Sequence, residues 1–255
     1  MNDDFRCTAA SVGDHEPIGG TAPTSAEFLF LEHPGPWGRL AVEDSRLPQE
    51  VKAYLANLSG VAVHLVRRHG GGSDGDGVRL FRAVATPEGF DVTTVVLPVV
   101  DDVVRLDLDT LEPYDAPLWL VCTNGSRDRC CAEIGRPVTA ALAERWPEAT
   151  WETTHLGGHR FSGTLLALPS GITLARLDAA TAVAACEGVL AGEVPASLSR
   201  GRAGRAGTAQ VLELHLAAGG DADVDVIAEP GPVRRQSCGD LKEKPTTRYR
   251  VVPRG

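Results

Sequence analysis

The sequence lacks the features that mark several large classes of protein. None of its apolar runs approaches the roughly 20 residues needed to cross a bilayer, and its first residues lack the basic start and apolar stretch of a secretory signal. We therefore expect a cytoplasmic protein that binds no membrane. The formal net charge of −9 repels nucleic-acid phosphates, which argues against a nucleic-acid-binding protein.

Sequence motifs of several enzyme classes are missing too. The chain has no Cys-x-x-Cys pair of the kind that thioredoxin chemistry uses. A phosphatase loop requires Cys-x5-Arg, whereas only four residues separate Cys122 from Arg127. The glycine-rich segment 70–77 lacks the Lys-Ser/Thr of a phosphate-binding loop, and no pair of carboxylates suggests glycoside hydrolysis. These absences favour a role other than catalysis.

The chain does contain enough apolar sequence for a core, together with six cysteines. Apolar residues make up 43% and charged residues 23% of the sequence, as in ordinary soluble globular proteins. In a reducing cytoplasm, cysteines near histidines are first considered as metal ligands or redox thiols. Cys186 lies in an alanine-rich segment and is expected in the core, whereas Cys7 and Cys238 are isolated thiols with no assignable role.

The periodicity of apolar residues predicts an α/β protein in three parts. Residues 1–112 form an N-terminal half that begins with an irregular arm over residues 1–25. A helix is predicted from Pro48 onwards, where apolar residues recur at helical spacing. The predicted strands of this half lie at 27–31, 61–66, 78–85 and 90–97.

Residues 113–194 are predicted to fold in a thioredoxin-like order, β-α-β, loop, β-β-α. The apolar run Leu118–Cys122 is typical of a central strand, and Pro137 is placed in the first turn of the following helix. A last helix is predicted to be capped by Asp178. The remaining strands of this part are predicted at 150–154, 164–168 and 172–177.

The first half opens with a similar order of elements, which raises the hypothesis of two related halves in tandem. Residues 195–255 are predicted to form a small α+β tail, in which a short helix at 208–217 precedes strands at 224–228 and 248–252. The glycines within 200–205 favour a flexible, solvated basic loop.

Cysteines and histidines gather at the predicted strand ends of the middle part. Cys122 ends the central strand, and the adjacent Cys130 and Cys131 lead into the next helix. His155 and His159 follow the neighbouring strand. Because ligands collect at the carboxyl edge of an open α/β sheet, parallel pairing of these two strands would bring the sulfur and imidazole groups together.

Two glycines, Gly157 and Gly158, separate the histidines. They permit positive φ angles and a tight turn, so that both imidazoles can point to one side. Two thiolates and two imidazoles suit a [2Fe–2S] cluster of the Rieske type, with a potential of roughly −150 to +300 mV. We therefore expect a protein that moves electrons.

Two alternatives remain open on these residues. One is a structural Cys2His2 zinc site, although zinc sites usually draw their cysteines from C-x2–4-C and here Cys131 follows Cys122 by nine positions. The other is a cysteine-dependent thiol oxidoreductase or peroxidase that uses Cys122 or the pair Cys130-Cys131.

Four segments carry a resemblance to a known family. They are Leu-Glu-His-Pro-Gly-Pro-Trp-Gly (31–38), Cys-Thr-Asn-Gly-Ser-Arg-Asp-Arg-Cys-Cys (122–131), Thr-His-Leu-Gly-Gly-His-Arg-Phe-Ser-Gly (154–163) and Ser-Cys-Gly (237–239). With these segments the chain resembles the sucrase/ferredoxin-like family, whose members carry a thioredoxin-like ferredoxin domain. The word sucrase in the family name is not read as an activity.

The resemblance implies a [2Fe–2S] cluster in an electron-transfer or redox-sensing protein. The implied ligands are Cys122, Cys131, His155 and His159. Cys130 is the alternative to Cys131, and counting from the shared Arg127-Asp128 favours Cys131.

Arg127 and Arg160, with Gly157 and Gly158, are predicted to surround the ligands. The two arginines then either neutralise cluster charge and donate hydrogen bonds to sulfur, or are ordinary surface residues. The sequence identifies neither the redox partner nor the oligomeric state.

Overall fold

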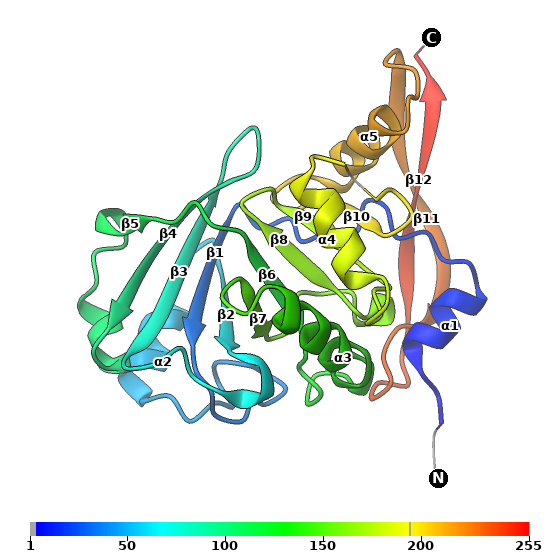
Figure 1. Cartoon of the computed structure of the whole chain (residues 1–255). Helices are drawn as coiled ribbons and strands as arrows, with labels where there is room; N and C mark the ends of the chain where they lie inside the picture. The colour runs from blue at the N-terminus through cyan, green and yellow to red at the C-terminus, as the bar shows by residue number, and fades with distance from the viewer. Residues whose placement is uncertain (1–3, 194, 255) are drawn as a thin grey trace.

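The computed structural model describes residues 4–193 and 195–254, and a large curled sheet dominates it (Figure 1). Within the described residues, ten strands join this sheet in the order β10-β9-β8-β6-β7-β2-β1-β3-β4-β5. These strands are β1 (Glu27–Glu32), β2 (Val61–Arg67), β3 (Val78–Ala85), β4 (Phe90–Leu97), β5 (Glu112–Pro113), β6 (Leu118–Cys122), β7 (Thr150–Thr153), β8 (Leu165–Leu168), β9 (Ile172–Leu174) and β10 (Ser199–Arg202). The α/β class is therefore as predicted.

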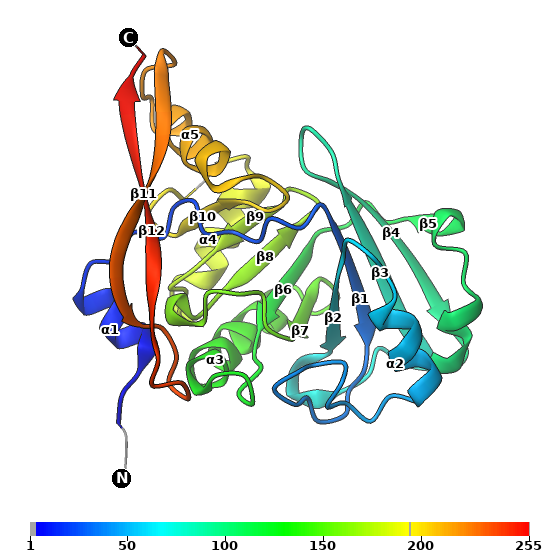
Figure 2. The ribbon, with the colours of Figure 1, turned by 180° about the vertical axis from the view of Figure 1, so that it is seen from behind.

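Helices cover both faces of the sheet (Figures 1 and 2). Helices α3 and α4 lie on one face, whereas α2 and the segment that leads from α1 to β1 lie on the other. The helices are α1 (Cys7–Gly13), α2 (Gln49–Ala56), α3 (Arg129–Arg145), α4 (Ala182–Leu190) and α5 (Gly207–Ala217), with short 3-10 turns η1 (His69–Gly71), η2 (Val100–Arg105), η3 (Leu108–Thr110) and η4 (His159–Phe161). Among the described residues, no helix combines the length and apolarity needed to cross a membrane.

Two sets of strands with the same pairing meet at one antiparallel seam. β6 pairs parallel with β7 and antiparallel with β8, just as β1 pairs parallel with β2 and antiparallel with β3. The seam joins β2 to β7, where Val66 lies opposite Thr153 and Arg67 opposite Glu152. One continuous sheet therefore runs through both sets.

The central strand β6 is buried along its whole length, as its apolar sequence predicts. Leu118 and Leu120 join the core cluster on one face of the sheet. Trp119 and Val121 point to the other face, into a core shared with α3 and α4, and Cys186 lies in that core as expected. The strand ends at Cys122 with no exposed position before it, so the site at its end is built on a rigid element.

Helix α3 corrects one sequence prediction. It begins at Arg129, because the side chain of Asp128 caps it by accepting a hydrogen bond from the Cys130 N–H. Pro137 therefore lies inside the helix and not in its first turn. Asp178 also differs from prediction: it accepts hydrogen bonds from Ala180 and Thr181 in the turn before α4, which starts at Ala182.

The N-terminal arm and the basic loop are more ordered than predicted. Residues 7–13 form helix α1. The Arg176 guanidinium holds this region by donating hydrogen bonds to the carbonyl oxygens of Ser11 and Glu16. Arg200 is 2% exposed and lies in strand β10 at the edge of the sheet, so the predicted solvated loop is wrong at this position. Strand pairing with β9 and buried polar contacts outweigh the flexibility of the glycines.

Strand lengths differ from the predictions in the later part of the chain. β9 ends at Leu174, because the next N–H groups, of Ala175 and Arg176, bond to Leu198 and Phe161 outside the strand ladder. The tail strands are longer than predicted and pair as a two-stranded hairpin of β11 (Val224–Arg235) and β12 (Glu243–Pro253). The predicted tail helix corresponds to α5.

Glu152 is a buried acid at the seam, and its replacement by glutamine gives a test of the fold. Its carboxylate accepts hydrogen bonds from Arg67 Nε and Thr123 Oγ1, both at 2.9 Å, and the side chain is 3% exposed. Burial opposes its ionisation, but the hydrogen bond and charge of Arg67 hold the pKa of Glu152 below its ordinary value. We expect Glu152→Gln to lower the free energy of unfolding by about 2–3 kcal/mol at neutral pH.

The sign of the pH dependence follows from that lowered pKa. The stabilisation by the carboxylate is complete above the unfolded pKa of about 4.3 and is lost as the pH falls through the lower folded value. The gap between wild type and Glu152→Gln in urea unfolding should therefore shrink in acid. The exposed Glu112→Gln serves as the control. Equal unfolding midpoints of wild type and Glu152→Gln at pH 7 would contradict the assignment.

Candidate metal centre

The four predicted ligands lie at one edge of the sheet. Cys122 is the last residue of β6, and His155 follows β7. The two strands pair in parallel with Cys122 opposite Thr153, as predicted, so both strands end at the same edge. Cys131 lies in the first turn of α3, and His159 is the first residue of η4.

Three of the four donors form one compact group. The Sγ atoms of Cys122 and Cys131 each lie 3.8 Å from Nδ1 of His155, and the three donor atoms lie within 4.8 Å of one another. His159 stands beside this group, because its Nδ1 lies 3.2 Å from Nε2 of His155. The sulfurs are buried and the two histidines half-buried, so the imidazole side is the one nearer to solvent.

The geometry separates the two adjacent cysteines. Consecutive residues of an α-helix point about 100° apart, so Cys130 and Cys131 face different neighbours. Cys131 faces Cys122 and His155, and its sulfur accepts a hydrogen bond from Ser162 Oγ at 3.7 Å. The sulfur of Cys130 lies 3.3 Å from that of Cys238, away from the predicted group. The structure thus brings Cys131, and not Cys130, to the other predicted ligands.

The histidine loop depends on its glycines and on a buried arginine. Gly157 and Gly158 have φ angles of 79° and 67°, as predicted for this turn. Arg200 donates a hydrogen bond from Nη1 to the Gly157 carbonyl oxygen at 3.1 Å. A Cβ atom on Gly158 would lie 2.7 Å from Nη2 of Arg200. No sequence pattern marks Arg200, because its partner on the loop is a backbone atom far away in the chain.

The electrostatics of the sulfur pair favour a thiolate at Cys122. A hydrogen bond from Cys131, helped by His155 and opposed by burial, lowers the pKa of Cys122 well below its ordinary value. The pKa of Cys131 is raised in turn, because its proton is shared with Cys122 and its sulfur is buried. Metal ions bind the thiolate form, so the pair is partly prepared for a metal.

The second histidine is held neutral. Burial, followed by the nearby His155, lowers the pKa of His159 to about 4. Its Nε2 atom is buried and has no hydrogen-bond partner among the described residues, and Asp128 Oδ2 lies 4.0 Å away. A neutral, buried imidazole with a free nitrogen has the protonation state that a metal ligand requires.

The predicted arginines surround His159 without reaching the sulfurs. The charges of Arg127 and Arg160 contribute to the lowered pKa of His159, after burial and His155. Arg160 donates from Nε to Glu16 at 2.9 Å and from Nη1 to Gln236 at 3.1 Å. Its hydrogen bonds within the described chain therefore go to oxygen.

Two cysteines that the sequence left without a role belong to a second group. Cys7 and Cys238 lie beside Cys130 and Asp128, with the four donor atoms within 4.8 Å of one another. The description of Cys7 and Cys238 as isolated is therefore wrong. The segment Ser-Cys-Gly at 237–239 gave a partial signal through the family resemblance, whereas no neighbour in the sequence distinguished Cys7.

Gly135 connects the site to the packing of α3, and its replacement by alanine should disturb both. A Cβ atom at Gly135 would lie 2.1 Å from the carbonyl oxygen of Cys122. We expect Gly135→Ala to push α3 away from β6, lower the free energy of unfolding by about 1–3 kcal/mol and reduce metal content. Urea unfolding and metal analysis of Gly135→Ala would measure both effects. Gly13→Ala, where nothing lies within 4 Å, is the matched control, and equal behaviour of the two variants would refute this account.

Comparison with known proteins gives one match. A family profile described as sucrase/ferredoxin-like matches residues 18–201, which include β1 to β9 and the four predicted ligands. Neither a curated protein nor a solved structure matches the chain significantly.

Proposed function

Since the chain belongs to the sucrase/ferredoxin-like family, we propose that it is an electron-transfer or redox-sensing protein that binds a [2Fe–2S] cluster. The proposed ligands are Cys122, Cys131, His155 and His159. The observation that carries the proposal is that both buried sulfurs lie 3.8 Å from Nδ1 of His155. Nδ1 of His159 lies 3.2 Å from the other ring nitrogen of His155.

The donor set fits such a cluster. Thiolate sulfur and neutral imidazole nitrogen are the ligands of Rieske-type centres. The thiolate that Cys131 and His155 favour at Cys122 and the neutral state of His159 supply donors in the required protonation states. When bound, a [2Fe–2S] cluster accepts and releases one electron, at a potential of roughly −150 to +300 mV with two histidine ligands.

The surrounding residues would set the reduction potential of the cluster and the route by which the electron reaches a partner. Burial of Cys122 and Cys131 excludes water from the sulfur side, and the Ser162 hydroxyl donates to the Cys131 sulfur. Both histidines are half-buried, so the shortest way to a partner leads through their rings. We propose that the redox partner docks over the loop that carries His155 and His159.

One observation favours a zinc alternative. Around a single tetrahedral zinc ion, the expected distance between a sulfur ligand and a nitrogen ligand is about 3.5 Å. The 3.8 Å separations between each sulfur and Nδ1 of His155 are close to this distance. In this alternative the same four residues form a Cys2His2 site with no redox chemistry.

Anaerobic purification of the full chain separates the two functions. The cluster proposal expects red-brown protein with about two iron and two sulfide per chain, and an EPR signal on reduction. A colourless chain that takes up no iron or sulfide on reconstitution, and that loses one zinc per chain in Cys122→Ser, would replace the cluster with the zinc site.

We also propose that the two sets of strands are thioredoxin-like halves derived from a duplication. Support comes from the identical pairing of β7-β6-β8-β9 and β2-β1-β3-β4, with a helix after the first strand of each set. The ligands come from the second set, within the proposed domain 113–194. The division into 1–112, 113–194 and 195–255 stays a prediction.

A further inference from the structure

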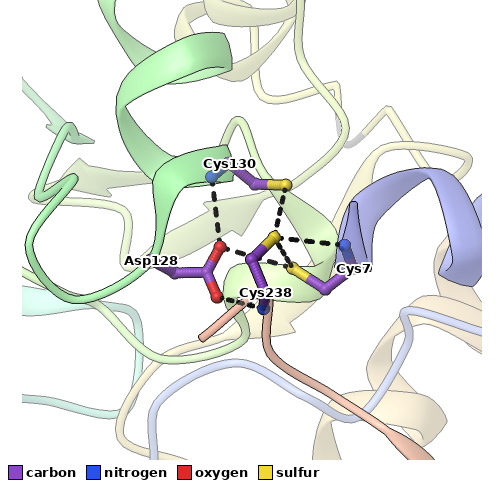
Figure 3. A group of neighbouring side chains, drawn as sticks. All are labelled: Cys7, Asp128, Cys130 and Cys238. Atoms are coloured by element: carbon purple, nitrogen blue, oxygen red, sulfur yellow. Dashed lines mark hydrogen bonds between the residues drawn. The ribbon is translucent and has the colours of Figure 1, made fainter. Parts of the chain in front are cut away.

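We propose that Cys7, Cys130, Cys238 and Asp128 form a second metal site that binds one zinc ion. This site is separate from the centre described above, and it does not depend on the identity of the metal there. Figure 3 shows the three sulfur atoms and the carboxylate turned toward a common point. The cysteines are unpaired, and Cys7, Cys130 and Asp128 are buried.

The side chains come from three distant parts of the chain. Cys7 opens α1, Asp128 and Cys130 stand at the start of α3, and Cys238 lies in the turn between β11 and β12. Asp128 follows Cys7 by 121 positions, and Cys238 follows Cys130 by 108. Side chains from such distant segments meet at one point only if the fold itself brings them together.

The distances match a single tetrahedral ion. Sγ of Cys238 lies 3.3 Å from that of Cys130 and 3.6 Å from that of Cys7, and Sγ of Cys7 lies 3.5 Å from Oδ1 of Asp128. Around zinc, with Zn–S of about 2.3 Å and Zn–O of about 2.0 Å, the tetrahedral edges are about 3.8 Å for S–S and 3.5 Å for S–O. A small outward shift of the sulfurs would admit the ion.

The backbone orients the donors. Oδ1 of Asp128 accepts a hydrogen bond from the Cys130 N–H at 3.1 Å. Oδ2 accepts hydrogen bonds from the Cys238 N–H at 2.8 Å and from the Ser237 hydroxyl. The N–H of Cys7 donates to the Cys238 sulfur at 3.3 Å. Hydrogen bonds of this kind position metal ligands in many proteins.

Positive charge beside the site offsets the surplus negative charge of three thiolates and a carboxylate on one divalent ion. The first turn of the 17-residue helix α3 contributes its dipole, because Cys130 lies in that turn. Arg6 precedes Cys7 and pairs through Nε with Glu133 at 2.7 Å, and its Nη1 atom is buried without a hydrogen-bond partner among the described residues. Soft thiolate ligands with a single oxygen ligand select zinc over magnesium or calcium.

A closed four-ligand site of this kind is structural. It would join α1 and the C-terminal hairpin to the helix turn that presents Cys131 to the first centre. Thr8 strengthens this link, because its hydroxyl donates to the His159 carbonyl oxygen at 3.2 Å. Loss of the ion should therefore loosen both chain ends and lower the melting temperature.

Metal analysis of the full chain, purified anaerobically without chelator, tests the proposal. Wild type and the core variant Cys186→Ser should each carry about one zinc per chain more than Cys7→Ser and Cys238→Ser. Cys7→Ser and Cys238→Ser should lose that zinc but keep the metal of the first centre. A zinc content equal to that of wild type in both Cys7→Ser and Cys238→Ser would overturn the second site.

Cobalt titration of the zinc-depleted wild type tests the same site without relying on a folded variant. One equivalent of Co2+ should give the thiolate charge-transfer and d–d absorption of a tetrahedral centre. Absence of that absorption, with a thiol count two lower than in reduced protein because Cys130 and Cys238 have formed a disulfide, would overturn the proposal.

Discussion

Replacing Cys131 by serine is expected to abolish iron binding, whereas replacing the adjacent Cys130 leaves it intact. The sulfur of Cys131 faces Cys122 and His155, and the sulfur of Cys130 faces Cys238. Serine offers a hard oxygen that stays protonated at neutral pH, so it cannot replace a thiolate on iron. In Cys131→Ser, iron and sulfide should each fall from about two atoms per chain to background. The visible absorption of the cluster should disappear with them.

Comparing Cys130→Ser with Cys131→Ser distinguishes loss of a ligand from a general packing defect. Both cysteines are 1% exposed and lie in the same helical turn, so a general packing defect would affect the two variants alike. Cys130→Ser should instead lose the zinc of the second site. Iron retained in Cys131→Ser and lost in Cys130→Ser would reverse the ligand assignment and refute the reading of the helix geometry.

The second large effect concerns the reduction potential. His155→Cys and His159→Cys are each expected to keep a cluster but to lower its potential, by on the order of 100 mV or more. Thiolate carries a negative charge that neutral imidazole does not, and this charge stabilises the oxidised cluster. All-cysteine plant-type clusters accordingly lie near about −400 mV. Redox titration followed by EPR measures the shift.

His64→Cys is the matched control for this experiment. Burial lowers the pKa of His64 to about 4, opposed by the nearby Cys122 and helped by His155. Its Nδ1 lies 3.4 Å from Thr154 Oγ1, and His64 is not among the grouped metal-binding side chains of the described residues. The control should change the potential little. A potential that is unchanged in both His155→Cys and His159→Cys would exclude histidine ligation.

Much of the fold followed from local patterns in the sequence. The apolar run of β6 and the alternation of β3 and β4 depend on burial within one strand, so periodicity identifies them. The start of α3 was misplaced, because the periodic apolar face begins near Val138 while the helix begins two turns earlier at an Asp128 cap. A cap is decided by one hydrogen bond, which periodicity does not report.

The first centre could be predicted from sequence because its donors stand close to recognisable strand ends and glycines. The second group could not, because Cys7, Cys130 and Cys238 meet only through the tertiary packing of both chain ends against α3. The basic segment illustrates the same limit. Its glycines suggested a solvated loop, yet Arg200 is buried among carbonyl groups that no local pattern connects to it.

Arg200 connects the N-terminal arm to the histidine loop. From the edge strand β10 its guanidinium reaches the Thr21 side chain at 3.1 Å and the Gly157 carbonyl at 3.1 Å. Removing residues 1–26 would take away Thr21, whose hydroxyl and carbonyl oxygen both accept hydrogen bonds from this guanidinium. The same truncation would remove Thr8, whose hydroxyl donates to the His159 carbonyl oxygen. It would therefore change how rigidly the imidazole ligands are held, so tags and truncations at the N-terminus belong among the variables of any redox measurement.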